Sequence, residues 1–114
     1  MLTAPEAAHF TLVAATEHPQ PQGKAIYVMG KGCVFFANNL APLPPAKAYQ
    51  LWMVPATGAP IPVGTFKPDA RGSATLVAPP MYEQTPAKAF AITIEPEGGS
   101  RTPTPPIVMS GAGQ

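Results

Sequence analysis

Proline and glycine occur too often along this chain for continuous helices to be expected. There are 17 prolines and 10 glycines among 114 residues. Inside a helix, proline removes a backbone donor and clashes with the preceding turn. The chain is nevertheless 46% apolar and only 11% charged, which is not the composition of a disordered protein. We therefore expect one domain built from many short strands that tight turns connect.

Two runs show the clearest strand pattern. Residues 90–95 alternate with a period of two, which predicts a half-buried strand. The two faces are Phe90, Ile92 and Ile94 toward the core and Ala91, Thr93 and Glu95 on the other side. Residues 48–54 are apolar on both faces, which predicts a central strand with one face in the core and the other beneath a loop. Gln50 and Trp52 share one face of that strand, and a buried Gln50 amide would need hydrogen-bond partners.

Shorter patterns predict six further strands. These are residues 9–16, 23–29, 33–38, 61–66, 73–77 and 107–109. Glycines at residues 30–32 predict a hairpin between the second and third strands, and Pro62 places the 61–66 strand near an edge. Asp69 and Gly72 belong to a turn that predicts a second hairpin. The expected fold is all-β, a small antiparallel β-sandwich or barrel of about seven to eight short strands with proline-rich loops. Residues 1–8 form a lead-in, and residues 9–114 form the single domain.

The charge pattern argues against a nucleic-acid partner. The net charge is +1, and the 7 lysines and arginines are scattered along the chain. No basic stripe is present to neutralise phosphates, and no polybasic segment favours a membrane surface. No apolar run reaches about 18 residues, so no membrane-spanning helix is expected within this sequence.

Metal ligands are sparse in this sequence. His9 and His18 have no cysteine or carboxylate cluster beside them, and no histidine follows Cys33, as a blue-copper loop would require. The methionines are expected to fill the core. Cys33 lies in an apolar run and is predicted to be a buried, inert thiol. We expect no metal site and no cofactor.

Catalytic patterns are also missing. Asp69 is explained by its turn, and no serine lies in a nucleophile-elbow motif. Glu95 and Glu97 flank Pro96 and could form a carboxylate pair, but a strand end followed by a glycine turn explains them better. We therefore predict that the chain is not an enzyme. Trp52 and Tyr82 are expected to pack in the core; their exposure on a shared concave patch would instead indicate a binding module.

Linked motifs give this chain a family resemblance over roughly residues 9–110. The motif residues are Tyr49, Gln50, Leu51, Trp52, Gly64, Phe66, Asp69, Gly72, Phe90, Glu95, Pro96, Gly98, Gly99 and Ser100, followed by Pro103 and Thr104. In this order they resemble the C-terminal domain of the anti-sigma-K factor family, of RskA type. Their expected roles are mainly structural.

The resemblance implies an extracytoplasmic regulatory domain of a membrane-anchored anti-sigma factor. In that family, a cytoplasmic module sequesters an extracytoplasmic-function sigma factor, and regulated proteolysis releases it. This sequence shows neither that module nor a membrane helix, so contact with a sigma factor is expected only through a module outside these residues. Residues 1–8 would then be a juxtamembrane linker. A site protease or an unidentified extracytoplasmic ligand is the expected partner. The alternative is an exported β-sandwich that binds a carbohydrate, a peptide or a protein.

Overall fold

The computed structural model contains eight strands and no helix among the residues it describes, which are 7–14, 21–28, 31–79, 87–105 and 107–112. The strands are β1 (Ala7–Ala14), β2 (Gln22–Val28), β3 (Gly32–Asn38), β4 (Lys47–Pro55), β5 (Ile61–Phe66), β6 (Ala74–Ala78), β7 (Ala87–Pro96) and β8 (Met109–Ala112). This confirms the all-β class and all eight predicted strand locations to within a few residues.

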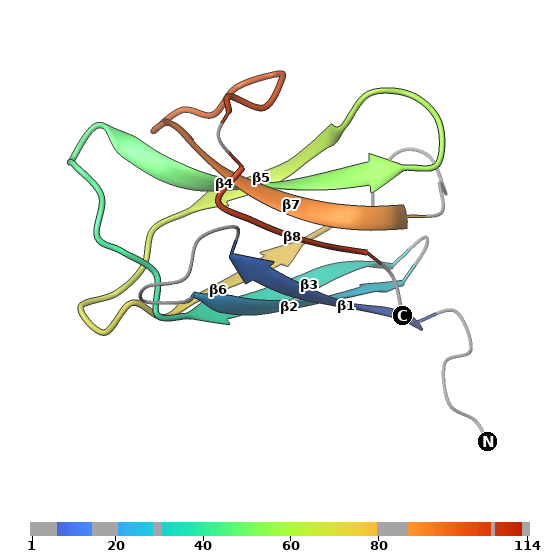
Figure 1. Ribbon diagram of the computed structural model, residues 1–114, viewed down its shortest axis with the longest axis horizontal. Coiled ribbons are helices and arrows are strands. Elements are labelled where there is room, and N and C mark those ends of the chain that lie inside the picture. The colour runs from blue at the N-terminus through green and yellow to red at the C-terminus, as the bar shows by residue number, and fades with distance from the viewer. Residues whose placement is uncertain (1–6, 15–20, 29–30, 80–86, 106, 113–114) are drawn as a thin grey trace.

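All the strands pair antiparallel in one sheet with the order β5-β4-β7-β8-β1-β2-β3-β6. The sheet folds over on itself, so that β4, β5 and β7 form one layer and β1, β2, β3 and β6 form the other (Figure 1). Strand β8 links the layers by pairing with both β7 and β1. The result is a nearly closed barrel whose open seam lies between β5 and β6, rather than two separate sheets.

Of the two predicted hairpins, the first is confirmed and the second is wrong. Strands β2 and β3 pair as expected, in a register that matches Tyr27 with Cys33. Strands β5 and β6 do not pair with each other; β5 pairs with β4, and β6 pairs with β3. The turn at Asp69 therefore carries the chain from one layer to the other. The edge position predicted from Pro62 is confirmed, because β5 ends the sheet.

The core lies between the two layers and is rich in aromatic rings. Phe10 and Phe90 meet edge to face with ring centroids 4.7 Å apart, and Tyr49 stacks on Phe66 at 5.7 Å. Cys33 is buried in this core, as predicted. Burial raises the pKa of the Cys33 thiol to about 11, so the thiol stays protonated and unreactive at neutral pH.

The alternation in β7 is correct as a division into two faces but wrong about burial. Phe90 and Ile92 are in the core, whereas Ile94, on the same face, is 38% exposed near the strand end. On the opposite face Thr93 and Glu95 have no exposed surface at all. The half-buried strand predicted from the pattern is thus buried on both faces from Phe90 to Thr93, because the segment that follows the strand folds back over the outer face.

Two strand boundaries also differ from the expectation. Strand β1 begins at Ala7, within the predicted lead-in, because Ala7 and Ala8 pair with β2. Strand β8 starts at Met109 instead of ending there. A Cβ atom on Gly111 would lie 1.9 Å from the Thr11 carbonyl oxygen, so the absent side chain lets β8 approach β1 closely. The residues that follow the last predicted strand therefore belong to the strand that links the two layers.

The turn after β5 holds the loop between β3 and β4 in place. Asp69 accepts hydrogen bonds from the backbone amides of Arg71 and Ser73 through Oδ1, at 2.8 and 2.9 Å. Gly72 has a φ of 83°, and its carbonyl oxygen accepts a hydrogen bond from the Leu40 amide. A Cβ atom on Gly72 would lie 2.7 Å from the Leu40 carbonyl oxygen. Glycine is therefore required here for both conformation and space.

Gly72→Ala is expected to lower the free energy of unfolding by about 2 kcal/mol, because it combines backbone strain with a backbone clash. Gly58→Ala is the matched control: Gly58 has a φ of 96°, but a Cβ atom there meets nothing within 4 Å. The control should cost about 1 kcal/mol, from strain alone. Urea unfolding of both variants tests this, and equal losses would show that the approach to Leu40 is unimportant.

Candidate functional site

A buried carboxylate organises the outer face of β4 and β7. Glu95 lies there among polar side chains, although it has no exposed surface. We define the Glu95 cluster as Gln50, Trp52, Thr93, Glu95, Ser100 and Thr104. Strands β4 and β7 contribute two members each. The last two come from the strap, which we define as residues 97–105, between β7 and β8 (Figure 1).

The Glu95 carboxylate accepts four hydrogen bonds from three residues. Oε1 accepts from the hydroxyl groups of Ser100 and Thr104, both at 2.8 Å. Oε2 accepts from the Thr104 backbone amide at 2.8 Å and from the Thr93 hydroxyl at short range. Both oxygens are therefore engaged, and no described cation pairs with them. Neutral donors alone solvate this buried charge.

The remaining members extend the network along the same face. The Trp52 indole N–H donates to the Thr93 hydroxyl oxygen at 2.8 Å, and that hydroxyl donates onward to Glu95. The Gln50 amide forms two bonds with the Ser100 backbone: its Nε2 donates to the carbonyl oxygen, and its Oε1 accepts from the amide. The partners anticipated for a buried Gln50 are thus present, and no buried side-chain polar atom in the described residues lacks a partner.

Two opposing effects set the pKa of Glu95. Burial raises the pKa, because it penalises the charged form, whereas hydrogen bonds from Thr93, Thr104 and Ser100 lower it. The hydrogen bonds prevail, and the pKa lies below the ordinary value of 4.5. The pKa of Asp69 is also lowered, chiefly by backbone amides of its turn, first that of Ser73. Both groups are therefore carboxylates at neutral pH.

Acid should destabilise the fold through these two groups. A folded-state pKa below the unfolded value contributes stability that is complete above the unfolded pKa and is lost as the pH falls through the folded one. We expect the free energy of unfolding to fall between about pH 6 and about pH 3. Urea unfolding at both pH values measures the loss. Glu95→Gln and Asp69→Asn should each reduce this pH dependence, and an unchanged dependence in both variants would contradict the assignment.

A fully hydrogen-bonded, buried carboxylate is suited to fastening chain segments rather than to acid–base chemistry. Proton transfer would require an open path to a reacting group, and each oxygen of Glu95 already has two partners. Among the described residues, no three histidine, cysteine, aspartate or glutamate side chains gather in a way that could hold a metal ion. No described helix has the length and apolar character that crossing a membrane requires.

The structure divides the residues of the sequence motif into three places. Gln50, Trp52, Glu95 and Ser100 come together in the cluster, with Pro96, Gly98 and Gly99 forming the turn that starts the strap. The core or β5 contains Tyr49, Leu51, Gly64, Phe66 and Phe90. The inter-layer turn contains Asp69 and Gly72. Thr93 and Thr104 were missed as cluster members, although Thr104 belongs to the proline–threonine pair in the motif.

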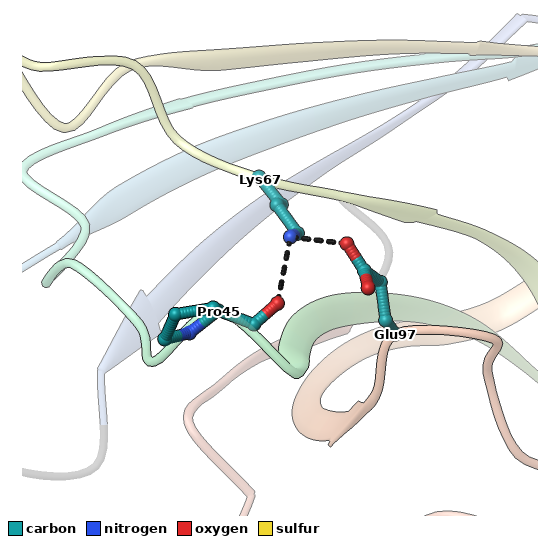
Figure 2. Close-up of polar contacts among 3 residues, drawn as sticks. All are labelled: Pro45, Lys67 and Glu97. Atoms are coloured by element: carbon teal, nitrogen blue, oxygen red, sulfur yellow. Dashed lines mark hydrogen bonds and ion pairs between the residues drawn. The ribbon is translucent and has the colours of Figure 1, made fainter.

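An exposed ion pair fixes the base of the strap. Figure 2 shows Lys67 between Glu97, with which it forms an ion pair, and the Pro45 carbonyl oxygen, 3.1 Å from Nζ. The Glu97 amide also donates to the Ala46 carbonyl oxygen at 2.9 Å. The end of β5, the loop before β4 and the strap therefore meet at one point on the surface.

Lys67→Ala is expected to change the free energy of unfolding by less than about 1 kcal/mol, because solvent screens exposed ion pairs. The side chains of Lys67 and Glu97 are 45% and 60% exposed. Thermal or urea unfolding in low and high salt provides the measurement. A loss of several kcal/mol would mean that this contact holds the strap more firmly than the Glu95 cluster does.

Trp52 is buried, as expected, so the exposed aromatic patch that would indicate a binding module does not form around it. The Trp52 side chain has no exposed surface, and it lies on the outer face of β4 rather than between the layers. Tyr82 and His18 lie outside the described residues, as do Met29 and Met81. His9 is exposed on β1, and Met53 and Met109 fill the core as expected.

A shallow groove crosses the outer face of the second layer instead. Its volume is about 620 Å³, and its lining includes Thr11, Val13, Lys24, Phe36 and Thr75. Phe36 is 42% exposed, and Lys24 is the one charged residue among the described residues of the lining. A smaller depression of about 410 Å³ lies between β5 and the strap, with Arg101 at its rim.

Comparison with known proteins identifies the family. The profile of the anti-sigma-K factor rskA C-terminal domain matches residues 1–107. The anti-sigma-K factor RskA of Mycolicibacterium vanbaalenii is 39% identical over 75 residues, which cover 65% of this chain and 30% of that protein. The anti-sigma-K factor RskA of Mycobacterium sp. strain KMS is 36% identical over 73 residues, which cover 64% of this chain and 29% of that protein.

A Streptomyces griseus protein described as an uncharacterized protein in the phr 5′ region is 38% identical over 71 residues, or 62% of this chain and 28% of the relative. The chain thus spans less than a third of the curated relatives that it matches. No solved structure matches it. With a family profile that matches nearly its whole length, this chain belongs to the anti-sigma-K factor RskA C-terminal domain family.

Proposed function

We propose that this chain is the extracytoplasmic regulatory domain of a membrane-anchored anti-sigma factor. The observation that carries the proposal is the family profile match over residues 1–107. The aligned region covers about 30% of the RskA relatives, so the sigma-binding part would lie in the rest of such a protein. In this proposal, the domain controls the release of an extracytoplasmic-function sigma factor through regulated proteolysis and performs no catalysis itself.

The fold suits a domain that controls access of a protease to the chain. Its strands are locked in a nearly closed sheet, and the Glu95 cluster fastens an exposed connection onto it. Proteases cut chain that is locally open, so a compact domain shields itself and nearby segments until something loosens it. A stress signal or a ligand that alters this stability would alter cleavage.

Deletion of the domain from its parent anti-sigma factor tests the proposal. Residues 7–112 are removed, and transcription from a sigma-dependent promoter is followed together with the pattern of anti-sigma fragments. A matched control replaces the domain with an unrelated compact β-domain of similar size. We expect deletion, and to a lesser degree replacement, to change sigma release under stress. Unchanged transcription and unchanged fragments under every stress applied would refute the regulatory role.

The second candidate is an exported module that binds a carbohydrate, peptide or protein. The groove with half-exposed Phe36 favours it, because an open aromatic ring beside polar side chains is a common ligand contact. The buried Trp52 counts against it. Titration of the chain with oligosaccharides and peptides, observed by NMR, distinguishes the two. Saturable shifts around Phe36 that Phe36→Ala abolishes would support the binding module.

A further inference from the structure

The strap is attached to the sheet by backbone hydrogen bonds near its start and by side-chain hydrogen bonds in its middle. Among its described backbone contacts, Glu97 donates to Ala46 and Gly99 donates to Pro96, both close to the point where β7 ends. Beyond the strap, the Val108 amide donates to the Ile92 carbonyl oxygen at 2.8 Å. The described backbone anchors therefore lie at the start of the strap and three residues beyond its end, and the strap between them pairs with no strand.

Two buried side chains provide the described attachments in the middle of the strap. Gln50 forms two hydrogen bonds with the Ser100 backbone. Glu95 accepts one bond from the Ser100 hydroxyl and two from Thr104, through its amide and its hydroxyl. All five bonds join the strap to the outer face of β4 and β7, and three of them depend on one carboxylate.

The strap lies outside the core between the two layers, and none of its described residues belongs to the core cluster. Arg101, Thr102, Thr104 and Pro105 are exposed, and Pro103 is half-buried. Water can replace most of the polar bonds when a segment lifts away, so their net contribution is modest. Segments with few buried apolar contacts open at lower free energy than the core of the same protein.

We propose that the strap is a proteolytic modification site that opens as a local unit, with Glu95 as its latch. Gly98 and Gly99, the latter with a φ of 88°, supply freedom of movement at one end, and the Val108 bond limits the other. An opened strap offers extended chain to an endoprotease that accepts a basic residue, with Arg101 already exposed. The enzyme then hydrolyses the Arg101–Thr102 peptide bond: water adds, and Arg101 acquires a carboxylate while Thr102 acquires an amine.

Opening of the strap depends only on contacts within the chain, so it does not require the anti-sigma role. A protease could exploit two kinds of opening. Global unfolding exposes every cleavable bond together, whereas opening of the strap exposes residues 97–105 while the sheet stays intact. If the regulatory role is also correct, the strap is where a loosening signal would take effect first.

Thr104→Val tests the latch on the strap side, because valine keeps the shape of threonine and removes its hydroxyl bond to Glu95. Thr102→Val is the matched control, an exposed strap residue without a described side-chain bond. Amide hydrogen exchange of the whole chain is followed by NMR, with rates corrected for each sequence. The Ser100 and Thr104 amides report directly, since Gln50 and Glu95 accept from them.

We expect Thr104→Val to speed exchange of these two amides about tenfold and to leave β2 and β3 unchanged, whereas Thr102→Val changes neither. Trypsin cleavage after Arg101, relative to a peptide of the same sequence, should rise by the same factor, while cleavage after Arg71 stays constant. Two outcomes would overturn the proposal: Thr104→Val behaves like Thr102→Val, or exchange rises equally in the strap, β2 and β3. Ser100→Ala, which removes another bond to Glu95, should repeat the expected pattern.

Discussion

Glu95→Gln is expected to lower the free energy of unfolding by about 3 kcal/mol, although it changes one heavy atom and keeps the shape of the side chain. A glutamine amide would present an NH₂ group where one carboxylate oxygen now accepts two hydrogen bonds. At least two of the four donors around Glu95 would then face a donor or lose their partner. Hydrogen bonds to a charged group contribute about 1.5–3 kcal/mol each. Urea unfolding at neutral pH, where the wild type is ionised, measures the effect.

Glu97→Gln is the control, two residues further along the chain. Glu97 is also a glutamate and is the first residue of the strap, but it is exposed and has an exposed lysine as its partner. Its replacement should cost less than about 1 kcal/mol. Comparable losses in the two variants would mean that the Glu95 carboxylate is not the buried hub described above.

The carboxylate explains why the motif around residue 95 has its particular form. Glu95 faces outward one residue before the end of β7, Pro96 ends the strand, and a turn with Gly99 at positive φ returns the chain over the same face. Ser100 and Thr104 then reach back to the carboxylate. Half of the motif residues that carry the family resemblance therefore lie in the Glu95 cluster or in the turn that starts the strap.

Much of the architecture could be predicted from local patterns. Periodicity of two located the strands, and the glycines around residue 31 gave the β2–β3 hairpin. Pro62 identified an edge, because proline cannot donate to a ladder on both sides. The two-faced apolar run at residues 48–54 correctly predicted a central strand with a covered outer face. Each of these inferences depends on residues that are neighbours in sequence.

The errors arise where distant segments decide the outcome. The turn at Asp69 has the residues of a hairpin turn, but β6 pairs with β3, and local turn chemistry cannot reveal which partner an edge strand takes. Residues 109–112 lack an apolar pattern, and their strand is defined by pairing with β7 and β1, where the missing side chain of Gly111 permits a close approach to the Thr11 carbonyl group. Glu95 looked like a solvent-facing residue because only the strap, folding back from residues 97–105, removes it from water.

The strongest test of the core is a pair of identical substitutions in β7. Ile92 and Ile94 belong to the same face of one strand, and the sequence pattern treats them as equivalent core residues. The structure does not, because Ile92 is fully buried and Ile94 is 38% exposed. Ile92→Ala should lower the free energy of unfolding by about 3–4 kcal/mol, since it leaves a cavity among packed side chains. Ile94→Ala should cost about 1 kcal/mol, because solvent fills much of the vacated space.

Urea unfolding of the two variants under one set of conditions gives the comparison directly, and the denaturant slope shows whether either substitution changes the surface that unfolding exposes. Each substitution removes the same atoms from the same strand, so differences in intrinsic strand preference cancel. A gap of about 2 kcal/mol or more would place the end of the core between residues 92 and 94. Equal losses would contradict the described packing and would mean that the core extends to Ile94, closer to the end of β7 where Glu95 holds the strap.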